Sequence, residues 1–200
     1  MADARLFAPS TARNREPILA VMQAHFPARG RVLEIASGAG EHAVFCAAAM
    51  PGLVWQPSDP DAESRASIEA WIAHEGRGNI LSPLAIDVTA QDWHLAGPFD
   101  AIVTINMIHI SPWGATQALM AGAGRLLASD GLLFLYGPYK RGGVTAPSNE
   151  AFDASLRARN PTWGVRDLEA VTREAQAHGL ALRDVVEMPA NNFSVLFAKS

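Results

Sequence analysis

Residues 31–43 read Arg-Val-Leu-Glu-Ile-Ala-Ser-Gly-Ala-Gly-Glu-His-Ala, and this stretch decides the fold. Val32, Leu33 and Ile35 form a short apolar run, which predicts a buried strand. Small residues follow it, and the alanine-rich stretch 43–49 predicts a helix. A strand, a glycine-containing turn and a helix start form the first half of a nucleotide-binding βαβ unit. Such a turn lets the backbone approach a ligand closely.

Two kinds of ligand are compatible with this turn. The spacing Gly38-x-Gly40-x-x-Ala43 fits the dinucleotide fingerprint, in which glycines face a pyrophosphate. S-adenosylmethionine (SAM) has no phosphate but carries an ammonium and a sulfonium, so the acidic Glu34 beside the turn favours SAM. A tight turn without any ligand is a third interpretation.

The composition predicts one soluble domain over residues 1–200. Hydrophobic residues make up 49% of the chain and the net charge is −4, which does not favour duplex nucleic acid as a partner. We find no signal-peptide pattern and no apolar run long enough to span a membrane, so we expect a cytoplasmic protein with no membrane partner. The single cysteine, Cys46, excludes a disulfide framework within one chain, and we expect no metal site. The oligomeric state stays open.

The second predicted strand begins at 53–55, and an acidic residue, Asp59, follows it. Asp59 follows Gly40 by 19 residues, the spacing of an acid that binds ribose hydroxyls in either cofactor. Asp61 is a rival for that role, although it is better placed as the N-cap of a helix over 62–75.

A third predicted strand, 80–86, also ends in an acid. Asp87 suits a carboxylate that accepts a hydrogen bond from the adenine amino group, with Val88 against the base. The alternative is a helix cap for residues 89–93. Because parallel strands end side by side, we predict that the acids of the first three strands gather at one edge of the sheet.

Polar candidates also follow the strands predicted over 101–105 and 132–136. They are Asn106 and His109 after the first strand, and Tyr139 and Lys140 after the second. In an α/β sheet this edge is the usual ligand position, although a lone histidine is often structural.

Two segments are candidates for covering a site. The helix predicted over 13–26 begins with polar residues. We interpret this start as a flap over the cofactor, with Asn14 as the residue that would reach it; a solvated helix start is the alternative. The excursion 137–166 is long for a connection and is expected to cover the substrate, with Trp163 and Arg166 as weaker candidates for holding an apolar or anionic acceptor. Its alternative is a solvated crossover with a short helix near 149–158.

The C-terminal part, 167–199, predicts a helix over 168–178 capped by Asp167, and then an antiparallel hairpin. Over 13–199 the order of parts resembles a class I SAM-dependent methyltransferase. In the fragment from Leu33 to Gly40, which resembles the first motif of that class, Ala36 replaces the usual first glycine. Four stretches are similar to a small methyltransferase-like family of unassigned function: 12–19, 106–113, 137–140 and 189–192.

The resemblance implies a Rossmann-like, doubly wound, mostly parallel seven-stranded α/β sheet with a C-terminal antiparallel hairpin. It also implies SAM as cofactor, S-adenosylhomocysteine as product and 31–136 as the cofactor-binding core; we expect a small-molecule acceptor. The expected cofactor contacts are Asn14, Glu34, Ala36, Gly38, Gly40, Asp59, Asp87, Val88 and Asn106. His109 is the first candidate base because an imidazole is poised near neutral pH, and Tyr139 and Lys140 come second. A NAD(P)-dependent oxidoreductase and a non-catalytic SAM-binding module are the alternatives.

Overall fold

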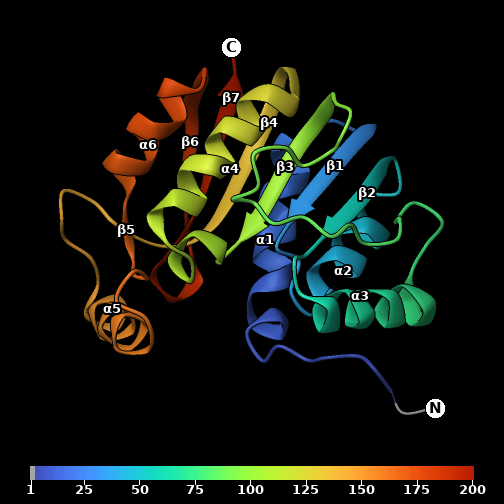
Figure 1. Cartoon of the computed structure of the whole chain (residues 1–200), viewed down its shortest axis with the longest axis horizontal. Coiled ribbons are helices and arrows are strands. Elements are labelled where there is room, and N and C mark those ends of the chain that lie inside the picture. The colour runs from blue at the N-terminus through green and yellow to red at the C-terminus, as the bar shows by residue number, and fades with distance from the viewer. Residues whose placement is uncertain (1–2) are drawn as a thin grey trace.

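The structure, a computed structural model, describes residues 3–200; residues 1–2 of the predicted domain lie outside the described residues. One sheet runs through it in the order β2-β1-β3-β4-β7-β6, and β5 pairs with the end of β4 (Figure 1). The strands are β1 (Gly30–Ile35), β2 (Leu53–Ser58), β3 (Phe99–Ile105), β4 (Leu127–Lys140), β5 (Arg166–Asp167), β6 (Leu180–Met188) and β7 (Asn192–Lys199). β2, β1, β3 and β4 are mutually parallel, whereas β7 is antiparallel to β4 and to β6.

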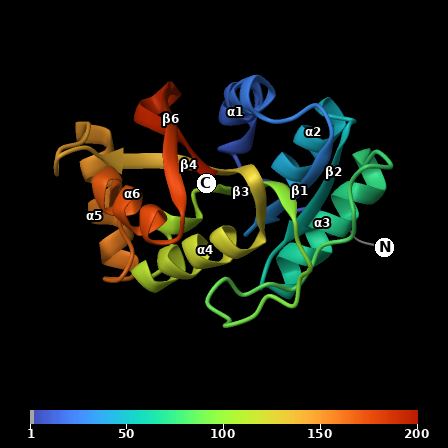
Figure 2. The ribbon, with the colours of Figure 1, turned by 90° about the horizontal axis from the view of Figure 1, so that it is seen from above.

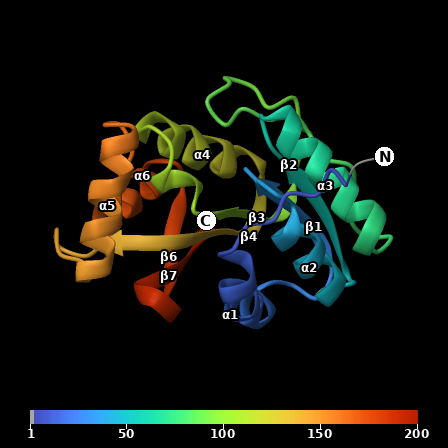
Figure 3. The same ribbon diagram turned by 90° about the horizontal axis from the view of Figure 1, so that it is seen from below.

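Helices cover both faces of the sheet, as the doubly wound prediction requires. They are α1 (Thr11–His25), α2 (Glu41–Ala49), α3 (Ala62–Glu75), α4 (Trp113–Leu126), α5 (Pro147–Arg159) and α6 (Leu168–Ala177), with short 3₁₀ turns η1 (Met107–His109) and η2 (Pro189–Asn191). Figures 2 and 3 show α1 and α2 on one face and α4 and α6 on the other. In the part of the chain that the structure describes, no helix is long and apolar enough to cross a membrane.

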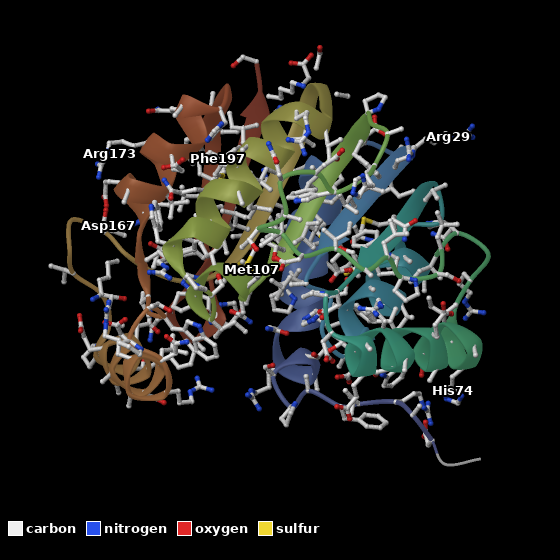
Figure 4. All side chains as sticks on the ribbon, viewed as in Figure 1. Arg29, His74, Met107, Asp167, Arg173 and Phe197 are labelled. Carbon is white, nitrogen blue, oxygen red and sulfur yellow. The ribbon has the colours of Figure 1, made fainter. Side chains whose placement is uncertain are left out.

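Alternation along the strands fills the two cores. On β4, Leu132 and Phe134 pack with α1 and α2, whereas Leu133 and Leu135 pack with α4 and α6. Successive side chains of a strand point to opposite faces, so an unbroken apolar run is what a sheet covered on both sides needs. In Figure 4 the labelled Phe197 lies among the packed side chains of the α4 face.

The predicted helices are confirmed, and two of them begin at the expected caps. Asp61 accepts a hydrogen bond from the Ser64 amide at 2.7 Å, and Asp167 accepts one from the Ala170 amide at 3.0 Å. The C-terminal hairpin is β6 and β7 joined by η2. Within the excursion, the helix expected near 149–158 is α5, so that segment carries regular structure of its own.

The predicted strand over 80–86 is wrong. The segment runs beside β2 but makes only two isolated parallel bridges, Trp55 to Ile80 and Ser58 to Leu84. Pro83 lies between them, and a proline has no amide hydrogen to continue a ladder. The sheet still has seven strands because the two-residue β5 supplies the seventh. The helix considered for 89–93 is also absent, and a turn and a bend occupy 88–91.

Candidate functional site

Two neighbouring hollows are lined by residues at the ends of the parallel strands. Figure 1 shows these strand ends at the lower edge of the sheet. The glycine-turn cleft, about 170 Å³, is lined by the turn after β1, by the arm before α1 and by the end of β3. The amide cavity, about 540 Å³, is lined by the start of α1, the end of β4, α5 and η2, with four asparagines in its wall. Ser10 and Asn106 line both hollows, so one wall is common to them.

The glycine turn has a left-handed backbone at three positions. The φ angles are 56° at Ala36, 57° at Gly38 and 93° at Gly40. A Cβ on Gly38 would meet nothing within 4 Å, so this position is open to a ligand. A Cβ on Gly40 would lie 2.9 Å from the Cα of Ile68, so that glycine lets α2 pack on α3. Ala36 is the one of the three that carries a side chain in a conformation that favours glycine.

Asp59 is bound directly to this turn. Its carboxylate accepts hydrogen bonds from the Gly38 amide at 2.9 Å and from the Asp61 amide at 3.0 Å, and the residue is only 7% exposed. A carboxylate offers about four acceptor positions, so two remain for a ligand's hydroxyl groups. Asp59 is not itself among the residues that line the cleft, but it is held against Gly38, which is; its ribose role stays a prediction.

Glu34 lines the same cleft and is almost completely buried. Trp55 Nε1 donates to its Oε2 at 2.7 Å. Burial raises the pKa of Glu34 to about 7; the Trp55 hydrogen bond opposes this rise and the charge of Asp59 adds to it. A cationic ligand in the cleft would lower this pKa, because it favours the charged carboxylate.

Asp87 and Val88 line neither hollow. The Asp87 side chain is exposed, and its Oδ1 accepts hydrogen bonds from the Thr89 amide at 2.9 Å and the Thr89 hydroxyl at 2.7 Å. These bonds lower the pKa of Asp87. Val88 packs partly against the core on the α4 face. Of the three acids predicted to gather, Glu34 and Asp59 meet at the turn, and the adenine role of Asp87 stays a prediction.

Asn14 joins the cleft to the amide cavity through two residues that the sequence did not single out. Its Oδ1 is 2.9 Å from Nε2 of His42, which lines the cleft. Its side chain also lowers the pKa of Tyr136, which lines the cavity, against the rise that burial causes. Burial, and then the charge of Arg15, lowers the pKa of His42 to about 4, so the ring is neutral. Tyr136 ends the apolar run of β4, and that position was the available signal for it.

His109 and Tyr139 lie behind the wall of the amide cavity. His109 is 0% exposed, and a Cβ on Gly137 would lie 2.4 Å from its Nε2. The rings of His109 and Tyr139 meet edge to face with centroids 5.1 Å apart. Neither ring nitrogen nor the Tyr139 hydroxyl has a hydrogen-bond partner among residues 3–200. Burial lowers the pKa of His109 to about 3 and raises that of Tyr139, so both are neutral near pH 7.

Lys140 takes part in an internal ion pair. Its Nζ and the Nε of Arg157 each lie 3.1 Å from Oδ2 of Asp153, which is 7% exposed. Asp153 Oδ1 also accepts a hydrogen bond from the Val165 amide at 2.7 Å. The ion pair therefore fixes α5 against the end of β4, and the catalytic role of Lys140 stays a prediction.

The two predicted acceptor contacts lie outside the amide cavity. Arg166 donates to the carbonyls of Ile108 and Ser111, which holds the η1 turn in place. The centroid of the Trp163 ring lies 5.6 Å from Cζ of the Arg159 guanidinium. From the excursion, the residues that do reach the cavity are Pro138 at the end of β4 and Asn149 and Phe152 of α5.

The fold is similar to that of solved SAM-dependent O-methyltransferases. An O-methyltransferase family protein from Burkholderia thailandensis matches with a TM-score of 0.80 at 16% identity, over 96% of this chain and 57% of that one. An O-methyltransferase family 2 protein from Planctomyces limnophilus DSM 3776, in complex with apigenin, matches with a TM-score of 0.79 at 19% identity, over 96% and 60%. CalO1, a methyltransferase in calicheamicin biosynthesis with S-adenosylhomocysteine bound, matches with a TM-score of 0.76 at 18% identity, over 96% and 55%.

This chain therefore spans between 55% and 60% of the length of these three proteins, and at such identities the likeness establishes the fold. The chain belongs to the family described as "Protein of unknown function (DUF938)", whose model matches residues 5–199. The family match confirms the resemblance to a family of unassigned function, and the solved structures confirm the expected methyltransferase fold.

Proposed function

We propose that the protein transfers a methyl group from SAM to a small-molecule acceptor. One observation carries the proposal: the glycine-turn cleft and the amide cavity share the wall made by Ser10 and Asn106. The cleft receives the cofactor and the cavity receives the acceptor. At about 540 Å³ the cavity has the size usual for small-molecule sites.

The residues of the cleft fit SAM. Gly38 leaves open space beside its backbone, and the Asp59 carboxylate next to it keeps two acceptor positions for ribose hydroxyls. The buried carboxyl group of Glu34 suits a cationic ligand, which would stabilise its ionised form. Among residues 3–200, the cleft is lined by two acids, Glu34 and Glu41, and by no lysine or arginine, and this acidic lining disfavours a pyrophosphate.

Bound SAM supplies a methyl group that is already activated on a sulfonium. The work left to the protein is to hold an acceptor atom in line with that methyl group, and such positioning contributes about 7–11 kcal/mol at best. Asn106 stands at the junction with φ of 63°, and its amide donates to the Tyr136 carbonyl at 2.8 Å. Strained backbone that the surrounding structure holds in place is typical of functional sites.

Calorimetric titration with SAM, S-adenosylhomocysteine and NAD(H) tests the proposal. We expect the first two to bind and NAD(H) not to bind. Binding of NAD(H) alone would overturn the proposal in favour of an oxidoreductase. SAM affinity without methyl transfer across a broad acceptor panel would instead identify a non-catalytic SAM-binding module.

A further inference from the structure

The amide cavity has an unusual set of polar groups for a site of methyl transfer. Among the residues that line it within 3–200, Arg13 is the one charged side chain, and no carboxylate, imidazole or amine accompanies it. The other polar side chains are hydroxyls and amides: Ser10, Asn14, Asn106, Tyr136, Asn149 and Asn192. The cavity therefore has no conventional general base and no group to pair with a cationic acceptor.

The contacts of Asn14 determine whether the phenol proton of Tyr136 is available to a molecule in the cavity. Neutral His42 faces the amide oxygen of Asn14 at 2.9 Å, so His42 is the donor there. The amide nitrogen of Asn14 is then the group left to face Tyr136, and the Asn14 side chain lowers the pKa of the phenol against the effect of burial. An amide N–H cannot accept a hydrogen bond, so the phenol proton of Tyr136, which lines the cavity, remains available to a molecule there.

Arg13 brings a free positive charge to the same end of the cavity. Within residues 3–200 its guanidinium takes part in no ion pair and no hydrogen bond, and the first turn of α1 contains no acid. Ser10 precedes it by less than one helical turn and lines both hollows. The free donors therefore gather next to the wall that the cavity shares with the cleft.

The far end of the cavity has the opposite character. Asn149 is 5% exposed and donates its amide hydrogens to the Asn191 carbonyl at 2.8 Å and to the Thr145 hydroxyl at 3.0 Å. Asn192 donates to the carbonyls of η2. Their amide oxygens are left to accept hydrogen bonds, so donors at one end of the cavity face acceptors at the other.

Building on the proposed function, we propose that the acceptor is an oxyanion that ionises by itself at neutral pH, held by the Tyr136 hydroxyl and the charge of Arg13. Carboxylates and acidic phenols or enols have this chemistry in common. The oxyanion oxygen forms the new O–CH₃ bond while the C–S bond breaks and its electron pair stays on sulfur. No proton has to be removed, so the absence of a base in the cavity is consistent with the reaction.

A coloured probe measures this preference without turnover. 4-Nitrophenol changes absorbance when it ionises, and we expect the protein to lower the apparent pKa of the bound dye, with and without S-adenosylhomocysteine present. Arg13→Gln and Tyr136→Phe should each weaken binding of the anion by roughly tenfold. Arg125→Gln is the matched control, because Arg125 is exposed on α4, on the opposite face of the sheet. An unchanged or raised pKa of the dye, or no binding, would overturn the inference.

Competition separates the two sources of the oxyanion. Displacement of the dye by benzoate but not by benzamide supports a carboxylate acceptor, and displacement by acidic phenols alone supports a phenolate. Either result supports the inference, whereas equal displacement by benzamide contradicts it. Calorimetry of the unmodified protein with SAM distinguishes this inference from the proposed function. If SAM does not bind, the proposed function is refuted; if SAM binds but the cavity shows no preference for the anion, only this inference is refuted.

Once a phenol is turned over, its pH profile gives a second test. The ionisable groups near the site are Arg13 and Tyr136 in the cavity, His42, Glu34, Glu41 and Asp59 at the cleft and its turn, and Arg15 on α1. Their contributions are the same for every acceptor. We therefore expect the acid limb of kcat/KM to move with the acidity of the substituted phenol, and a limb that stays fixed would reveal a protein base and overturn the inference.

Discussion

The cofactor half of the site and the acceptor half are built in different ways. The cofactor half, from β1 to α3, takes its key groups from one contiguous run between Glu34 and Asp61. The acceptor half collects its wall from the start of α1, the end of β4, α5 and η2. The first half has buried acids, and the second has an arginine and hydrogen-bond donors. Each half thus suits the ligand that we propose for it, cationic SAM for the first and an anionic acceptor for the second.

The largest effect is expected from Asp59→Ala, which removes the acid fixed to the glycine turn. Loss of two charge-assisted hydrogen bonds to a ribose should cost about 4 kcal/mol, or roughly a thousandfold in SAM affinity. Calorimetry measures the affinity, and circular dichroism checks that the fold is retained.

Asp61→Ala is the matched control, because Asp61 is a neighbouring carboxylate that caps α3. It should lower the unfolding free energy by about 1 kcal/mol and leave SAM affinity unchanged. If both variants lose SAM equally, the turn needs the helix cap rather than a ribose contact, and the role proposed for Asp59 fails.

The difference between the halves also explains what could be predicted from the sequence. In the cofactor half, strand, turn, helix and cap follow one another in register, so local patterns locate Glu34, Gly38 and Asp59. The strand over 80–86 was mispredicted because apolar content outweighed Pro83, which interrupts the ladder. The hydrophobic pattern of this segment suits a strand, but its backbone hydrogen bonding does not.

In the acceptor half, the sequence located the right strand ends but not the groups that line the cavity. The link from His42 through Asn14 to Tyr136 joins three distant parts of the chain, so no spacing reveals it. His109 follows a strand as a ligand-binding residue would, yet the close packing of Gly137 and Tyr139 buries it. Burial of this kind depends on tertiary packing, which no local pattern encodes.

Glu34→Gln tests the buried acid of the cofactor half through pH. The folded pKa of about 7 lies above the ordinary 4.5, so the unfolded chain releases this proton first as pH rises. The unfolding free energy of the ligand-free protein should therefore fall between pH 4.5 and 7, by roughly 3 kcal/mol from this group. Urea unfolding across that range should show a shallower fall in the variant, and parallel curves would mean that Glu34 titrates normally.

His109→Leu tests the buried histidine of the acceptor half, where the sign is reversed. The folded pKa of about 3 lies below the ordinary 6.5, so the unfolded chain takes up this proton first as pH falls. Stability should be fully present above pH 6.5 and drop by roughly 3 kcal/mol from this group by pH 4. The same urea series should show less acid sensitivity in the variant.

The rate of methyl transfer by His109→Leu then tests whether His109 is the predicted general base. If the ring only packs, methyl transfer to a responsive phenol persists in the variant. A loss of about a hundredfold or more, with fold and SAM affinity intact, would restore His109 as the general base and require the cavity wall to open.

The smallest effect is expected from Asp87→Ala, which makes the same change as Asp59→Ala at the third predicted acid. Asp87 is exposed, and its Oδ1 is already engaged by Thr89, so the strength of an adenine hydrogen bond there is limited by water. We expect a loss of at most about 1 kcal/mol, or roughly fivefold in SAM affinity by calorimetry. If Asp87→Ala instead matches Asp59→Ala, residues 80–88 must close over the adenine when SAM binds, and the acids of all three segments would then meet at one ligand. A small effect would limit the acidic contacts with SAM to Glu34 and Asp59, the two residues that the strand-and-turn pattern places together.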